Sequence, residues 1–237
     1  MSGVKGDLAV ADGKRMTRGK LIVIDGTDGS GKATQTALLV KRLKKAGKKV
    51  RTISFPRHGH PSGYMVDQYL AGKFGTAGQV GPYRGSMFYA IDRYAASFEI
   101  RQWLKQGYIV IADRYVSANM GHQTGKINGT AARLKFLTWL EKLEYKIFGI
   151  PKPDLTMLLY MTPIISRSLV RKRGHKQDIH EQDKHHIEQA AKAYLFVAKH
   201  YHWPIIDCAP KGKLLGIPEI HDLVWTAVKK RLLTSDF

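Results

Sequence analysis

A glycine-rich turn that ends in a lysine is the feature of this sequence with the most direct chemical meaning. The turn comprises Gly26, Thr27, Asp28, Gly29, Ser30, Gly31 and Lys32. Its G-x-x-x-x-G-K spacing lets successive backbone N–H groups point inward around a phosphate, and the lysine adds a mobile ammonium. An apolar run precedes the turn and a helical pattern follows it, so a helix N-terminus contributes about half a positive charge. The turn therefore predicts a site for the phosphates of a nucleoside triphosphate.

The residue after the lysine departs from the usual form of this loop. A serine or threonine hydroxyl normally ligates Mg²⁺ there, but this chain has Ala33, which has no ligand atom. Thr34 lies about 100° further round the helix and is better placed for a phosphate oxygen. If Mg²⁺ binds, carboxylates and water must therefore provide more of its octahedral shell.

The order of apolar and helical segments predicts the elements that position this loop. Continuous apolar runs, typical of parallel strands covered on both faces, occupy 21–25, 50–55, 108–113, 155–161 and 204–208. Helical patterns occupy 33–46, 85–106, 130–148, 181–201 and 218–232. The alternation predicts an α/β P-loop NTPase fold with three α/β/α layers, in which helices flank a five-stranded parallel sheet. Ligands of such sheets gather at the carboxyl ends of the strands.

The chain is long enough for one such domain. Residues 1–18 show no periodicity and are predicted to be a flexible N-terminal extension. Residues 19–237 are predicted to form one P-loop domain with a short lid at about 166–180.

The charge balance is strongly basic, with 39 Lys and Arg against 19 Asp and Glu, a net charge of +20. This excess suits an enzyme whose substrates are phosphate anions, and it is also compatible with nucleic-acid binding. The basic residues are spread along the chain without a dense tail. We therefore favour phosphate attraction over a nucleic-acid partner.

Other compositional features exclude several classes of protein. No apolar run is long enough to cross a membrane, and the N-terminus lacks the apolar segment of a secretory signal. Cys208 is expected to be a small core residue. Because it has no partner for an intrachain disulfide, the sequence fits a reducing compartment and predicts a cytoplasmic protein. His180 and His185 are five residues apart, so they do not share a helix face, which argues against a zinc site.

Six ordered motifs resemble those of the thymidylate kinases over roughly residues 19–232. They are IDGTDGSGKAT at 24–34, SFPRHG at 54–59, FYAIDR at 88–93, DRYVSANMGHQ at 113–123, GIPKPD at 149–154 and RKRGHKQDIHE at 171–181. The resemblance implies a kinase that uses ATP and Mg²⁺ to phosphorylate dTMP.

The resemblance implies roles on the ATP side of the site. The loop residues from Gly26 to Thr34 would bind ATP together with Arg171, and Asp28 and Asp113 would lie at the metal. Asp28 also resembles a carboxylate that contacts the acceptor sugar. The catalytic group implied comprises Asp28, Lys32, Arg114 and a lid arginine, for which we favour Arg173.

The resemblance implies a second set of residues around the acceptor. Arg57 and Arg114 resemble arginines that grip the acceptor phosphate, Phe55 walls that site, and Tyr89 takes the place of an aromatic ring that stacks on thymine. The remaining positions that resemble acceptor contacts are Arg93, Asn119, His122, Gln123, Asp178 and Glu181. Members usually have tyrosine or phenylalanine where His122 stands, and that ring helps to exclude a 2′-hydroxyl.

We therefore predict phosphorylation of dTMP to dTDP, with two alternatives. One is another nucleoside monophosphate kinase with a different pyrimidine acceptor, suggested by His122 and Tyr89. The other is a basic nucleic-acid-binding P-loop protein, suggested by the +20 charge and Ala33. The resemblance also implies a homodimer formed through the helices at 85–106 and 130–148, and no membrane partner.

Overall fold

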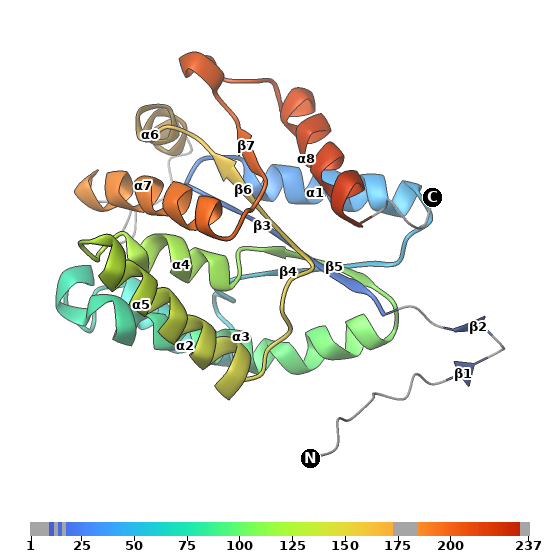
Figure 1. The fold of residues 1–237 in the computed structure, drawn as a ribbon, viewed down its shortest axis with the longest axis horizontal. Helices are drawn as coiled ribbons and strands as arrows, with labels where there is room; N and C mark the ends of the chain where they lie inside the picture. Colours follow the sequence, from blue (N-terminus) through green and yellow to red (C-terminus); the bar gives the residue numbers. More distant parts are fainter. Residues whose placement is uncertain (1–9, 12–13, 16–17, 173–183, 233–237) are drawn as a thin grey trace.

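A computed structural model describes residues 10–11, 14–15, 18–172 and 184–232 of the chain (Figure 1). Its centre is a five-stranded sheet in the order β4-β5-β3-β6-β7, and every neighbouring pair is parallel. The strands are β3 (Lys20–Gly26), β4 (Val50–Ser54), β5 (Ile109–Asp113), β6 (Leu155–Tyr160) and β7 (Ile205–Asp207). The predicted five-stranded parallel sheet is confirmed.

Helices cover both faces of this sheet, because side chains along each strand alternate between the faces. Leu21 and Val23 of β3 pack in a cluster with α3 (Ala77–Lys105), α4 (Val116–Thr124), α5 (Thr130–Glu141) and α7 (Lys184–His200). Ile22 and Ile24 face the opposite layer, formed by α1 (Lys32–Lys45) and α8 (Ile217–Leu232). The three predicted layers are visible in Figure 1. Cys208 is buried in the second cluster, which confirms it as a core residue.

The strand register brings the predicted site together. Ile24 pairs with Asp113, and Gly26 pairs with Leu159, so the loop that follows β3 begins beside the end of β5. The chain after β5 then turns into α4, whose residues line the same cavity as that loop.

Several elements differ from the sequence prediction. The edge strand β4 exposes Arg51, Thr52 and Ser54, so the expectation that every strand is covered on both faces is wrong there. α3 begins at Ala77, well before the predicted start, behind a capping box in which Thr76 and Gln79 bond reciprocally. The predicted helix 130–148 changes to a π-helical segment, η2 (Lys142–Ile147). α2 (Tyr64–Leu70), α4 and α6 (Pro163–Lys172) were not predicted as helices.

Shorter elements complete the described chain. They are the 3₁₀ turns η1 (Pro61–Gly63) and η3 (Pro210–Gly212), and the two-residue strands β1 (Val10–Ala11) and β2 (Lys14–Arg15), which pair antiparallel. The predicted extension 1–18 thus contains one paired segment, and the rest of 1–17 lies outside the described residues. No described helix combines the length and apolar character that crossing a bilayer needs.

Candidate active site

A cavity of about 380 Å³ opens at the carboxyl ends of β3, β4 and β5. Most of the residues that the sequence singled out line it. They are Asp28, Gly29, Gly31, Lys32, Ala33, Thr34, Phe55, Tyr89, Arg93, Asp113, Arg114, Asn119, His122 and Gln123. The fold therefore brings the phosphate loop, which follows β3, into one cavity with residues from α3, β5 and α4.

The phosphate loop has the backbone geometry that its glycines predicted. Gly29 and Gly31 have φ values of 77° and 85°, which side chains disfavour, and Gly31 caps the N-terminus of α1. A Cβ on Gly26 would lie 2.2 Å from the carbonyl oxygen of Leu159, so only glycine allows this approach of β3 to β6. Gly26, Thr27 and Ser30 are not among the residues that line the cavity, and Thr27 Oγ1 donates to the carbonyl of Met161 over 3.3 Å.

Lys32 lies across the loop. Its Nζ donates to the carbonyl oxygens of Gly26 and Thr27 over 3.0 and 2.9 Å. Burial and the neighbouring charge of Arg114 lower the pKa of Lys32 to about 8. A bound phosphate would oppose both effects, so the site is built to hold the ammonium more firmly when an anion is present.

Asp28 and Arg114 form an ion pair at the floor of the cavity. The Arg114 guanidinium donates to Asp28 Oδ1, and Lys32 Nζ lies 3.9 Å from the same oxygen. Burial alone would raise the pKa of Asp28, but the charges of Arg114 and Lys32 outweigh burial and hold the pKa well below its usual range. Arg114 has a φ of 66°, a conformation uncommon outside glycine, directly after β5. Asp28 is thus ionised between two cations throughout the physiological range.

Asp113 is the second predicted metal-proximal carboxylate. It lines the same cavity as Asp28 and Lys32, and burial raises its pKa above the usual value. Among the described residues, no three histidine, cysteine or acidic side chains cluster as a metal site. Two carboxylates near a phosphate loop fit Mg²⁺, because this ion commonly keeps several waters and binds one or two carboxylates plus phosphate oxygens.

Aromatic and amide side chains form the other half of the cavity. Phe55 and Tyr89 contribute rings, and Asn119 Nδ2 donates to the carbonyl of Ser86 over 3.1 Å. Gln123 is buried, and its Oε1 has no hydrogen-bond partner among the described residues. Buried polar atoms are rarely left unpaired, so this oxygen marks a place for a ligand donor or a water. The ring of His122 packs edge-on against Tyr194 at 5.3 Å.

Arg93 has a partner that the sequence did not indicate. Its guanidinium donates to both carboxylate oxygens of Glu144 and, over 3.2 Å, to the carbonyl of Tyr115. Both charged side chains are buried, with 1% and 0% of their surface exposed. Arg93 still lines the cavity, but most of its donors hold η2 against α3.

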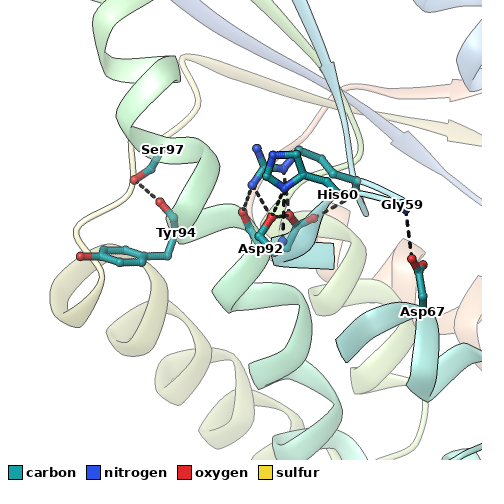
Figure 2. A network of polar contacts seen from close by, with 8 residues as sticks. Gly59, His60, Asp67, Asp92, Tyr94 and Ser97 are labelled. Carbon is teal, nitrogen blue, oxygen red and sulfur yellow. Dashed lines mark hydrogen bonds and ion pairs between the residues drawn. The ribbon is translucent and has the colours of Figure 1, made fainter. Parts of the chain in front are cut away.

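Arg57 is not among the residues that line the cavity. Pro56 and His58 line the cavity, whereas Arg57 turns to the carboxylate of Asp92 on α3. Figure 2 shows Asp92 at the centre of this polar network, with His60 beside it. Arg57 as a contact of the acceptor phosphate therefore stays a prediction, and a buried carboxylate holds part of its guanidinium.

The lid residues are described only in part. Arg167 on α6 lies 3.9 Å from Glu188 on α7, an ion pair between a half-buried arginine and an exposed glutamate. Arg173, Asp178, Glu181 and the side chain of Arg171 lie outside the described residues.

Sequence reasoning missed a buried cluster behind the phosphate loop. Asp25, the last β3 residue before Gly26, accepts hydrogen bonds from Ser117 Oγ and, over 2.9 Å, from Tyr194 Oη. This cluster ties α4 and α7 to the base of the loop. A buried strand that ends in a carboxylate was the available signal, whereas nothing local marks Tyr194, which lies 169 residues away.

The chain is similar to known thymidylate kinases in sequence. The family model described as thymidylate kinase matches residues 24–215. The thymidylate kinase of Mycobacterium tuberculosis is 31% identical over 185 residues, covering 75% of this chain and 85% of the relative. That of Plasmodium falciparum is 26% identical and covers 93% of this chain and 95% of its own.

A solved structure shows the same fold. The thymidylate kinase of Candida albicans superposes with a TM-score of 0.70, covering 90% of this chain and 92% of that one. At 23% identity, this similarity concerns the fold alone.

Proposed function

The chain belongs to the thymidylate kinase family, and we propose that it phosphorylates dTMP to dTDP with ATP at the cavity described above. One observation carries the proposal. The phosphate loop with Lys32, a ring-and-amide pocket with Tyr89 and Gln123, and the guanidinium of Arg114 all line a single cavity. ATP at the phosphate loop and a nucleoside monophosphate with its base at the rings and amides would therefore bind with their phosphates facing each other.

The residues account for the chemistry of this transfer. The acceptor phosphate oxygen is already ionised, so the protein needs no covalent nucleophile. It must align two anions and neutralise charge on the transferring group. Lys32 and the loop amides act on the ATP phosphates. Arg114, held by Asp28, presents a permanent positive charge where the two substrates meet.

We propose that Mg²⁺ accompanies ATP and that Asp113 and Asp28 hold it. When bound, the ion would neutralise phosphate charge as a Lewis acid. Ala33 provides no hydroxyl, so the two carboxylates, water and phosphate oxygens would complete its shell. A lid arginine, Arg173 or Arg171, remains our candidate for the last charge on the transferring group.

The acceptor half suits a pyrimidine nucleotide. Tyr89 offers a ring for stacking, and the amides of Asn119 and Gln123 offer hydrogen bonds to a base edge. His122 lines the wall where a larger ring is usual in the family, so selectivity against a 2′-hydroxyl is expected to be weaker than usual. The cytosol is the proposed location, as the unpaired Cys208 suggests.

An acceptor panel tests the proposal. ADP release coupled to a spectroscopic reporter is measured with ATP, Mg²⁺ and each of dTMP, dUMP, dCMP, UMP, CMP, AMP and GMP. We expect the highest kcat/KM with dTMP. If another pyrimidine nucleotide gives a higher kcat/KM, that nucleotide replaces dTMP as the proposed acceptor. If folded protein turns over none of them, the proposed kinase activity is wrong. DNA binding that salt weakens, without acceptor-dependent ADP release, would favour the nucleic-acid alternative.

We also propose a homodimer that forms through α3. Along this helix Met87, Ile91 and Phe98 are 45%, 46% and 59% exposed, and their spacing places them on one face with Tyr94. Ile147 of η2 adds a further exposed apolar side chain. Monomeric proteins rarely leave such a stripe open to water, so a second copy is the partner that we expect.

A further inference from the structure

A buried carboxylate organises the loop that follows β4. Asp92 lies on α3 and has no exposed surface. Its Oδ1 accepts from Arg57 Nε over 2.8 Å and from Ser62 Oγ over 2.6 Å, and its Oδ2 accepts from the Arg57 backbone N–H over 2.9 Å. These contacts surround Asp92 in Figure 2. Both carboxylate oxygens are thus used to hold one residue, Arg57, and the hydroxyl beside it.

The same contacts use most of the donors of Arg57. A guanidinium has five N–H groups: one on Nε and two on each terminal nitrogen. Nε is bound to Asp92, and Nη2 donates to Ser62 Oγ over 2.5 Å and to the carbonyl of Asp92 over 3.1 Å. Among the described residues, Nη1 has no hydrogen-bond partner. Only the two N–H groups of Nη1 therefore remain for a ligand.

The backbone packing fixes the same loop from the other side. A Cβ on Gly63 would lie 2.2 Å from the carbonyl oxygen of Arg57, so η1 closes tightly over that residue. His60 Nδ1 lies 2.9 Å from Ser62 Oγ, which places this hydroxyl in contact with three groups. The loop therefore presents Arg57 in one orientation.

We propose that Asp92 is a positioning residue for the acceptor phosphate: it holds Arg57 by Nε and Nη2, so that Nη1 alone reaches the phosphate from the rim of the cavity. This inference rests on the proposed function. Arg57 leaving Asp92 would strand a buried carboxylate without a cation, a larger cost than a single charged hydrogen bond returns. The acceptor therefore takes the remaining donors and does not displace Asp92.

Steady-state kinetics of four variants test this inference. Asp92→Asn keeps the shape of the side chain and removes its charge, and we expect KM for dTMP to rise about tenfold while kcat and KM for ATP change less than about threefold. Ser62→Ala should raise the same KM by a smaller factor. In an Arg57→Ala background, adding Asp92→Asn should leave KM unchanged, because Asp92 acts through Arg57.

Asp67→Asn is the matched control. Asp67 is the other carboxylate on this loop, and it holds His58 Nδ1 at 2.5 Å and the N–H of Gly59 at 3.1 Å, without touching Arg57. Its KM for dTMP should stay within twofold of the wild type. Thermal unfolding identifies variants that fail to fold. If Asp92→Asn does not fold, the KM for dTMP of Ser62→Ala is the test in its place.

Three results would overturn the inference. The first is an unchanged KM for dTMP in Asp92→Asn. The second is a lower KM in that variant, which would mean that Asp92 competes with the phosphate for Arg57. The third is an equal change of KM on Asp92→Asn substitution in the wild type and in the Arg57→Ala background. Each is read against an active wild type. A wild type that does not turn over dTMP overturns the proposed function instead, which the acceptor panel reveals first.

Discussion

At the residue scale, the site depends on charges that offset one another. Asp28 lies between Arg114 and Lys32, which keeps the carboxylate ionised and fixes the Arg114 guanidinium within the cavity. An arginine held this way has lost side-chain freedom before any ligand arrives, so less entropy is lost on binding. Lys32 differs, because it contacts neutral carbonyls and can move to a phosphate.

Removing the lysine ammonium should abolish turnover. We expect Lys32→Ala to lower kcat by a factor on the order of 10³ or more, as for other charges on a transferring phosphoryl group. Lys41→Ala, an exposed lysine on the same helix, is the control and should keep wild-type rates. Circular dichroism checks the fold of both variants. Substantial activity in folded Lys32→Ala would refute the assignment of the loop.

Binding of ATP should depend on pH through Lys32. Its pKa of about 8 in the free protein is set by burial and by Arg114, against Asp28, Asp25 and Asp113. The protonated ammonium binds phosphate, so a bound triphosphate raises this pKa and affinity is full below pH 7. As pH rises above about 8, the dissociation constant should increase, with a limiting slope of about tenfold per unit. Equilibrium binding of ATP at pH 7.0 to 9.5 measures this, and a flat profile would contradict it.

At the element scale, the start of α1 and the contact between α3 and η2 position the residues that line the cavity. α1 begins at Lys32, the last residue of the phosphate loop, so the helix N-terminus with its unpaired N–H groups lies at the loop. η2 contributes Glu144, whose pair with Arg93 joins two elements that lie 51 residues apart in sequence. The part of the cavity that Arg93 lines is therefore held by an ion pair as well as by apolar packing.

Restoring the missing hydroxyl should strengthen metal use. Ala33 lies at the first turn of α1 and lines the cavity, so Ala33→Ser places an oxygen where Mg²⁺ is commonly ligated. We expect the Mg²⁺ concentration for half-maximal rate to fall a few-fold. Ala37→Ser, one turn further along the exposed side of α1, should leave it unchanged. Equal responses of the two variants would mean that the ion lies elsewhere.

Breaking the buried pair should destabilise the domain. Glu144→Gln leaves the Arg93 guanidinium buried without its counter-charge, which costs about 3–5 kcal/mol for a pair of this kind. At about 2–4 °C per kcal/mol in a domain of this size, the melting temperature should fall by roughly 6–20 °C. Lys146→Gln, exposed on the same segment, provides the control in thermal unfolding. An unchanged melting temperature would show that the pair is dispensable.

At the scale of the whole molecule, the two faces of the sheet have different tasks. The α1–α8 layer covers one face, and the opposite layer contributes α3 and α4, whose residues Tyr89, Arg93, Asn119 and Gln123 line the cavity (Figure 1). The exposed apolar residues of α3, Met87, Ile91, Tyr94 and Phe98, belong to that second layer.

Charge placed on the stripe should separate the copies. Light scattering after size exclusion should give a dimer for the wild type and a monomer for Phe98→Glu, because a buried carboxylate without a partner is costly at an apolar interface. Leu223→Glu changes an apolar side chain on α8 that is 45% exposed and should remain dimeric. A monomeric wild type at micromolar concentration would reject the α3 interface.

The sequence by itself determined the phosphate loop, the sheet and most of the cavity lining. These features depend on local rules: glycines where φ is positive, a strand before the loop and a helix after it, and polar residues at strand ends. Lys32, Asp113 and Arg114 follow from such rules because parallel strands align their carboxyl ends.

Only the tertiary structure decided which partners the charged side chains take. Asp92 lies 35 residues from Arg57, Glu144 lies 51 residues from Arg93, and Tyr194 lies 169 residues from Asp25. Nothing in the local sequence shows which carboxylate will hold a given arginine. The partner depends on how elements far apart in sequence pack together. The free-energy cost of burying a charge is low only where that packing places an opposite charge beside it.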